Sequence, residues 1–203
     1  LAAIPLGVLA AWFHGRWLDR GITASAVLAF SVPSFVVGYL LILAFSVKLN
    51  WLPVQGFRPP SEGIGNWLRH LVLPTLTLAT IYVALITRIT RASMLDILGE
   101  DFIRTARAKG VTERFVLFRH ALRNAAVPIV TIVGVGVTAL ISGVVVTETI
   151  FNIAGVGRLI VDSVLARDYP VVQGTILFFS FAYILVNLLI DVLYVLLDPR
   201  IRY

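Results

Sequence analysis

The residues best suited to chemistry lie together between positions 100 and 110, where three cations alternate with small side chains. Guanidinium and ammonium groups form charge-assisted hydrogen bonds with carboxylates and phosphates. Small side chains between them let a helix approach another surface closely. The pattern therefore predicts an element that docks into a groove of a protein partner. The candidate residues are Glu100, Asp101, Arg104, Thr105, Ala106, Arg107, Ala108, Lys109 and Gly110.

Local signals predict a short helix from Asp101 to Ala108. Acidic side chains at its start and Lys109 near its end suit the helix dipole, and Gly110 can adopt the left-handed conformation that ends many helices. A basic amphipathic segment can also rest on anionic lipid headgroups, which is the alternative to a protein partner.

A second helix is predicted after Thr112, which can cap it. Phe115, Phe118 and Leu122 follow at spacings of three and four and predict an apolar stripe along it. Pro128 lies near the start of the next apolar segment, where its missing N–H costs little.

The amino-acid composition indicates that the rest of the chain lies in a membrane. Hydrophobic residues make up 59% of the chain and charged residues 14%, and the mean hydropathy is +0.93. A helix of roughly 20 apolar residues crosses a bilayer, and lipid offers its backbone groups no partner outside the helix itself. We therefore predict an all-α polytopic membrane protein. The uncharged segments are residues 21–47, 70–87, 124–147 and 169–190.

The chain starts with a shorter apolar run, residues 1–13, followed by Arg16 and Arg20. A signal peptide carries its positive charge before the apolar run, so we predict the second half of a membrane helix whose beginning is missing. The chain has no cysteine and its three histidines are far apart, which argues against a metal site.

Most of the 17 Lys and Arg residues lie in the loop after residue 13, in residues 88–123 and in the C-terminal tail. Short loops rich in these residues stay in the cytoplasm. We therefore predict that these three segments are cytoplasmic and that residues 47–69 and 148–168 face the other side. This topology accounts for the net charge of +6, and we expect no nucleic-acid binding.

Longer motifs resemble a known family. RTARAKG at residues 104–110 and RHALRNA at residues 119–125, with Pro128 after them, look like the cytoplasmic coupling loop of bacterial ABC importer permeases of the dipeptide, oligopeptide and nickel group. The general motif of the superfamily begins Glu-Ala-Ala. Here Arg104 and Thr105 replace its first two residues.

The third alanine of that motif and its glycine are matched by Ala106 and Gly110. Other stretches extend the resemblance along the whole chain, and the last two are similar to the B-type subunit of the permease pair. These stretches are GVLAAW at residues 7–12, SVPSFVVGYLL at 31–41, TETIFNIAGVGRLIVDSVLARDYPVVQG at 147–174 and DVLYVLLDPRIRY at 191–203.

The resemblance implies a type I ABC importer permease fold in one transmembrane domain. About five membrane helices are expected here, the first partial, out of six in an N-terminally longer family member. The expected segments are a partial span at residues 1–13, spans at 24–46, 70–90, 127–148 and 173–196, the coupling loop at 91–126, an extracytoplasmic loop at 149–172 and a cytoplasmic tail at 197–203.

The resemblance also implies partners and a place in the cell. The partners would be a C-type permease subunit, two cytoplasmic ATP-binding subunits, an extracytoplasmic solute-binding protein and the lipid of the bacterial cytoplasmic (inner) membrane. Peptide is the expected substrate, with a nickel chelate or glutathione as alternatives. The chain lacks a phosphate-binding G-x-x-x-x-G-K-[ST] motif, so we expect no ATP hydrolysis by it and no cofactor.

In such a transporter the helix from Asp101 to Ala108 would act as a rigid lever between the ATPase and the membrane. The family also places the extracytoplasmic loop near the outer gate and the binding protein. Glu148 ends an uncharged span, and Arg158 or Arg167 could anchor its carboxylate. The candidates in this region are Glu148, Arg158, Asp162, Arg167 and Asp168.

Small polar residues within the predicted spans either pack helices together or line a pathway. The candidates are Ser34, Thr77, Thr80, Thr131, Thr138 and Ser142. Three alternatives remain open. A secondary transporter or channel would need charges deep in the spans, an intramembrane enzyme would need a catalytic constellation there, and an anchoring scaffold would share the docking loop without transport.

Overall fold

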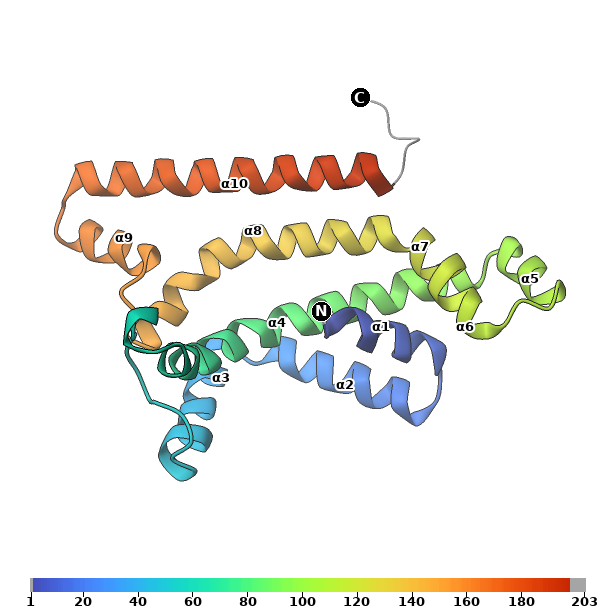
Figure 1. Ribbon diagram of the computed structural model, residues 1–203, viewed down its shortest axis with the longest axis horizontal. Helices are drawn as coiled ribbons and strands as arrows, with labels where there is room; N and C mark the ends of the chain where they lie inside the picture. Colours follow the sequence, from blue (N-terminus) through green and yellow to red (C-terminus); the bar gives the residue numbers. More distant parts are fainter. Residues whose placement is uncertain (1, 198–203) are drawn as a thin grey trace. The chain divides into compact units, whose positions relative to one another are not determined.

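The computed structural model describes residues 2–197, and the side chains of residues 138, 141–143 and 193–197 lie outside the described part. Helices dominate it, and no strand occurs within residues 2–197 (Figure 1). The elements are α1 (Ala3–Trp12), α2 (Trp17–Ser31), α3 (Ser34–Leu41), η1 (Ile42–Lys48), η2 (Pro60–Glu62), α4 (Ile64–Leu98), α5 (Asp101–Ala108), α6 (Glu113–Phe115), η3 (Val116–Ala121), α7 (Leu122–Asn124), α8 (Ala126–Ile150), α9 (Val156–Leu165) and α10 (Tyr169–Leu197).

Within the described residues, α4 and most of α10 are each long and apolar enough to cross a membrane. Two bent helix pairs, α2 with α3–η1 and α6–α7 with the first half of α8, raise the number of candidate spans to four if each pair is one span. Helix α1 is apolar but shorter. The predicted all-α polytopic class is confirmed. Residues 198–203 of the expected tail lie outside the described residues.

Helix boundaries differ from the expected spans at several points, among them the break between α2 and α3 and the end of α4. The segment expected as one span at residues 24–46 is interrupted between α2 and α3, because Pro33 has no N–H to donate and its ring disfavours helical backbone at Val32. Helix α4 extends to Leu98, beyond the expected end at residue 90. Its last turns stay helical since they carry the buried Met94 and the ion-paired Arg91.

The chain divides into two compact units. Within the described residues, unit 1 consists of residues 2–31, 82–136 and 187–197, and unit 2 consists of residues 32–81 and 137–186.

The apolar core of unit 1 joins α1, the end of α4, α5 and the helical segment that runs from α6 to α7. Met94, Ile103 and Leu117 are completely inaccessible to solvent. Each large side chain buried in this way contributes about 1.5–3 kcal/mol to folding. The buried members are Val8, Ala11, Met94, Ile103, Ala106, Val116, Leu117, Ala121, Ala125 and Ile129.

Unit 2 has a smaller core, formed by Ile42, Leu73, Ile150 and Phe151. Two hydrogen bonds tie the loop after η1 to the end of α8: Gln55 Nε2 donates to the Ile150 carbonyl at 2.9 Å, and the Gly56 N–H donates to the Phe151 carbonyl at 2.8 Å. This loop therefore holds one end of α8 within unit 2.

Candidate functional site

Helix α5 occupies the predicted bounds, Asp101–Ala108, and its end has a well-defined hydrogen-bonding pattern. Gly110 adopts a φ of +80°, its N–H donates to the Arg107 carbonyl at 2.9 Å, and the Val111 N–H donates to the Ala106 carbonyl at 3.2 Å. This pair of bonds is the Schellman motif, which requires a left-handed residue at the glycine position. The prediction that Gly110 ends this helix is confirmed.

Helix α5 has one buried side and one exposed side. Ile103 has no exposed surface and Ala106 is 9% exposed, and both belong to the core of unit 1. Ala106 therefore packs inside the chain. A Cβ atom added at Gly110 would meet nothing within 4 Å, so this glycine serves the backbone conformation and no close contact within the chain. Phe102, which the sequence analysis did not single out, is 43% exposed.

Two of the three cations of this segment have partners within the chain. Arg104 pairs with Asp101 at 3.3 Å, and both side chains are largely exposed. Arg107 donates from Nε to Glu113 Oε1 at 2.8 Å, which links α5 to the start of α6. The Arg107 pair therefore closes the turn between the two helices. The exposed side of α5 and its C-terminal turn carry Glu100, Asp101, Phe102, Arg104, Thr105, Arg107, Ala108, Lys109 and Gly110.

The predicted apolar stripe of the second helix, Phe115, Phe118 and Leu122, is not the side that packs most tightly on the core. Phe115 is 46% exposed and Phe118 is 58% exposed, whereas Val116, Leu117 and Ala121 form the buried side. Leu122 is partly buried against the core.

The physical reason for this difference is the helix type. Residues Val116–Ala121 form a π-helix, in which hydrogen bonds join residues five apart, so positions four and five apart share a face. The prediction assumed the α-helical period of 3.6 residues. Thr112 stands at the N-cap position as expected, but its side chain makes no capping hydrogen bond.

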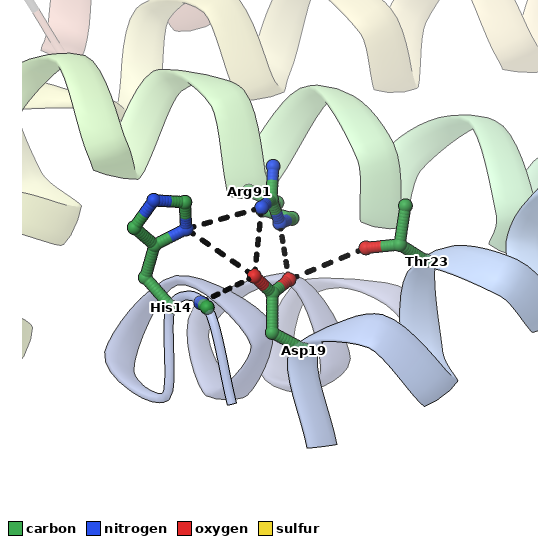
Figure 2. A network of polar contacts seen from close by, with 5 residues as sticks. His14, Asp19, Thr23 and Arg91 are labelled. Atoms are coloured by element: carbon green, nitrogen blue, oxygen red, sulfur yellow. Dashed lines mark hydrogen bonds and ion pairs between the residues drawn. The ribbon is translucent and has the colours of Figure 1, made fainter. Parts of the chain in front are cut away.

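A polar network that sequence reasoning missed fastens the α1–α2 hairpin to α4 (Figure 2). Arg91 donates from Nε to Asp19 Oδ1 at 2.5 Å and from Nη2 to Asp19 Oδ2 at 2.8 Å. The Gly15 N–H and the Thr23 hydroxyl also donate to the Asp19 carboxylate, at 2.9 and 3.3 Å. Asp19 is 3% exposed, so this carboxylate is buried with its charge compensated.

His14 completes the network, because its Nδ1 lies 3.2 Å from both Asp19 Oδ2 and Arg91 Nη2. From sequence, His14 stands apart from the other histidines, and Arg16 and Arg20 are explained by membrane topology alone. The available signal was Asp19 itself, an acidic residue between Arg16 and Arg20 in an otherwise basic turn.

Helices α1 and α4 also approach each other closely at Gly7. A Cβ atom at Gly7 would lie 2.5 Å from Thr90 Cβ and 2.8 Å from the Thr87 carbonyl oxygen. The Thr87 hydroxyl donates to the Ala3 carbonyl at 3.2 Å. Together with the Asp19–Arg91 pair, this contact fixes α1 against the part of α4 that leads into α5.

In unit 2, the Glu148 carboxylate caps the start of α9. Its Oε2 accepts from the backbone N–H of Arg158 at 2.7 Å, and Glu148 is 8% exposed. Arg158, one of the two residues predicted to anchor this carboxylate, therefore does so through its backbone N–H, while its guanidinium contacts Asn152 and Asp162. A helix N-terminus offers unpaired N–H groups and a favourable dipole to a carboxylate, which explains the contact. A Cβ atom at Gly155 would lie 1.9 Å from Glu148 Oε1, so only glycine leaves room there.

The other charged residues of this loop divide into two groups. The Arg158 side chain contacts Asn152 and pairs with Asp162 at 3.5 Å, so three of the predicted residues, Glu148, Arg158 and Asp162, are linked along α9. Arg167 lies beyond the other end of α9 with a φ of +58°. Asp168 Oδ1 accepts from the Val171 N–H at 3.3 Å at the start of α10.

Pro170 does not end α9, because it lies in the first turn of α10. The first turn tolerates proline because its N–H groups have no partner within the helix. The C-terminal end of α9 is instead formed by two backbone hydrogen bonds. The Arg167 N–H donates to the Val164 carbonyl, and the Asp168 N–H donates to the Ser163 carbonyl.

The residues predicted to line a pathway differ in how deeply they are buried within the protein. Thr77 is completely buried in unit 2, where it donates to the Leu73 carbonyl, and its Cγ2 lies 3.4 Å from the position of a Cβ on Gly38. It therefore packs α4 against α3. Ser34 and Thr80 are half-buried and Thr131 is exposed. The side chains of Thr138 and Ser142 lie outside the described residues.

Comparisons with known proteins agree with this architecture. A family profile described as "binding-protein-dependent transport system inner membrane component" matches residues 3–203. A probable peptide ABC transporter permease of Sinorhizobium fredii is 50% identical over 200 residues, 98% of this chain and 64% of the relative. A putative peptide transport permease of Brucella abortus is 46% identical with the same coverage.

A glutathione transport permease of Escherichia coli K12 is 49% identical over 197 residues, 97% of this chain and 62% of the relative. The chain therefore spans slightly less than two thirds of the length of these curated relatives.

Proposed function

The chain belongs to the family of binding-protein-dependent transport system inner membrane components, and we propose that it is a permease subunit of an ATP-driven importer of peptides. Family membership places it in the inner membrane as a multi-pass protein. The peptide substrate is supported by the relatives from Sinorhizobium fredii and Brucella abortus, which are named for peptide transport. The second permease, the two ATP-binding subunits and the solute-binding protein are the partners we propose.

The observation that carries this proposal is the attachment of α5. Ile103 and Ala106 fix one side of this short helix in the core of unit 1, and its other side is exposed with Phe102, Arg104 and Thr105 on it. A helix held in this way moves as a rigid body when a partner displaces it. The exposed side of α5 is therefore the proposed docking surface for an ATP-binding subunit. In this proposal the ATP-binding subunit hydrolyses ATP.

Motion of α5 would reach the membrane helices through contacts already described. Ile103 and Ala106 of α5 belong to the same buried cluster as Val8 and Ala11 of α1, Met94 of α4 and Ile129 of α8. The Asp19–Arg91 pair links α2 to the same stretch of α4. A displacement at the docking surface is thus shared by four helices of unit 1, which gives the proposed coupling a physical route.

In unit 2, α9 is the proposed contact for the solute-binding protein. Arg158 and Asp162 expose 39% and 62% of their side chains and pair with each other. Glu148 fixes the start of α9 through the Arg158 backbone. Here Glu148 positions the helix from its buried site, and the exposed residues make the contact.

The proposal is tested by reversing charge on the docking surface. Arg104→Glu together with Lys109→Glu should leave the amount of protein in the membrane unchanged, because both side chains are exposed. The variant should lose co-purifying ATP-binding subunits and peptide-stimulated ATP hydrolysis in the purified complex, and peptide uptake by cells should fall at least tenfold. Lys48→Glu, an exposed cation in unit 2, is the control for a change of charge elsewhere.

Wild-type uptake and complex recovery in the double variant would remove the docking role of α5. Isolation of the wild-type protein without any ATP-binding subunit, with uptake intact, would favour a self-contained transporter. A scaffold would show normal association and no uptake defect on deletion.

Glutathione is the second candidate substrate, since one relative is named for glutathione transport at 49% identity. Competition of radiolabelled tripeptide uptake by glutathione, by dipeptides and by a nickel chelate separates these substrates. Inhibition by glutathione alone would reassign the substrate and leave the permease assignment intact.

A further inference from the structure

An open hollow of about 580 Å³ lies on the α6–α7 segment of unit 1. It is lined by Thr112, Arg114, Phe115, Phe118, Arg119 and Arg123. All six residues are exposed, and the core of unit 1 takes the opposite side of this segment. The hollow is therefore an outward surface with a basic and aromatic composition.

The positive charge of this surface is uncompensated. Glu113, the nearest acidic residue in sequence, is engaged by Arg107. Among the described residues, no carboxylate forms an ion pair with the arginines that line the hollow. The Arg119 guanidinium lies 5.3 Å from the centre of the Phe115 ring, which steadies it without neutralising it.

The hollow also lies next to the start of α8, whose first half belongs to a candidate membrane span. Arg123 stands about one helical turn before α8 begins at Ala126. The large rings of Phe115 and Phe118 are exposed beside the arginines. Aromatic rings and arginines combine in this way where a protein meets the headgroup layer of a bilayer.

We propose that this hollow binds the phosphate headgroup of an anionic phospholipid, with Arg119 and Arg123 on the phosphate and Phe118 in the interfacial layer. Guanidinium groups suit phosphate oxygens because their N–H donors form a planar fork. The site is separate from the exposed side of α5, so one loop serves a protein partner with its first helix and a lipid with its second. The inference goes beyond the proposed transport function and holds whatever the substrate is.

The test titrates the purified complex in zwitterionic detergent with phosphatidylglycerol and counts bound lipids by native mass spectrometry. Arg119→Gln together with Arg123→Gln should weaken the tightest phosphatidylglycerol site about tenfold or more, because two charge-assisted contacts are lost. Phosphatidylcholine, which carries no net charge, should bind equally weakly to both forms. Arg119→Lys with Arg123→Lys should retain part of the affinity.

The matched control is Arg16→Gln with Arg20→Gln, which removes the same charge from exposed residues of unit 1. An equal loss of phosphatidylglycerol in both double variants would overturn the site and leave only general attraction to a basic protein. Binding of inorganic phosphate without binding of phosphatidylglycerol would also overturn it. Loss of ATP-binding subunits with unchanged lipid binding would assign the surface to the protein partner.

Discussion

Arg91 holds Asp19 with two parallel N–H donors, at 2.5 and 2.8 Å, and so joins the start of α2 to the last third of α4. The Asp19 side chain is 4% exposed and the Arg91 side chain 24% exposed, so the pair is only partly screened by solvent. Two further donors, the Gly15 N–H and the Thr23 hydroxyl, complete the coordination of Asp19.

Removal of either charge should destabilise unit 1. Asp19→Asn or Arg91→Gln leaves a charge without its partner in a mostly buried position, which costs about 3 kcal/mol. Thermal unfolding of the purified protein should shift downwards in each single variant. The double variant should lose less than the sum of the two, as expected for a direct interaction, whereas strictly additive losses would argue against the pair.

Gly7→Ala should weaken the contact between α1 and α4, because its Cβ would lie 2.5 Å from Thr90 Cβ. The expected loss is about 1–3 kcal/mol, typical of overpacking. Gly21→Ala is the control, since a Cβ there meets nothing within 4 Å and α2 is helical at this position. Its stability should be unchanged or raised, and equal melting temperatures for the two variants would refute the close approach.

Gly110→Ala should act through the backbone alone. The φ of +80° disfavours a Cβ, so the expected cost is about 1–2 kcal/mol, and Gly110→Asn should cost less. The position has open space around it, so no packing loss is added. Hydrogen exchange of the Val111 amide reports the Schellman bonds directly. Unchanged protection in the alanine variant would mean that the turn does not depend on this residue.

Gly155→Ala should displace Glu148 from the start of α9, because the new Cβ would lie 1.9 Å from Oε1. Glu148→Gln keeps the shape and removes the charge that the helix N-terminus favours, so its effect should be smaller. Both changes should raise hydrogen exchange at the Arg158 amide. If transport falls in Gly155→Ala while this exchange stays unchanged, Glu148 has a role other than capping α9.

The variant Arg167→Gly tests whether the Arg167 side chain contacts the solute-binding protein, because it relieves backbone strain and removes the side chain at the same time. Arg167 has a φ of +58°, which glycine adopts without cost, so stability should rise by about 1 kcal/mol. The melting temperature should then rise by about 2–4 °C. Reduced affinity for the solute-binding protein together with raised stability would show that the side chain is kept for the contact, and unchanged affinity would exclude it from the interface.

Several features of this protein follow from the sequence alone, for identifiable reasons. Hydrophobic content and segment length determine the all-α polytopic class. In lipid the backbone N–H and C=O groups have no water to bond, and an α-helix pairs them within one segment. The bounds of α5 follow from local rules at its ends, where an acidic start and Gly110 act within a few residues. Motifs spread along the chain indicated the family that the profile match then established.

Tertiary structure decided which side chains meet. The partner of Asp19 is far away in sequence, so nothing local marks Arg91 as its counterpart. The buried side of η3 follows from π-helical hydrogen bonding, whereas the predicted stripe, based on a period of 3.6 residues, included Phe115 and Phe118, which are exposed. At Glu148 the charge pattern predicted an arginine partner, but the carboxylate accepts a hydrogen bond from a backbone N–H at the N-terminus of α9. This N–H group becomes available as a donor only when α9 has folded.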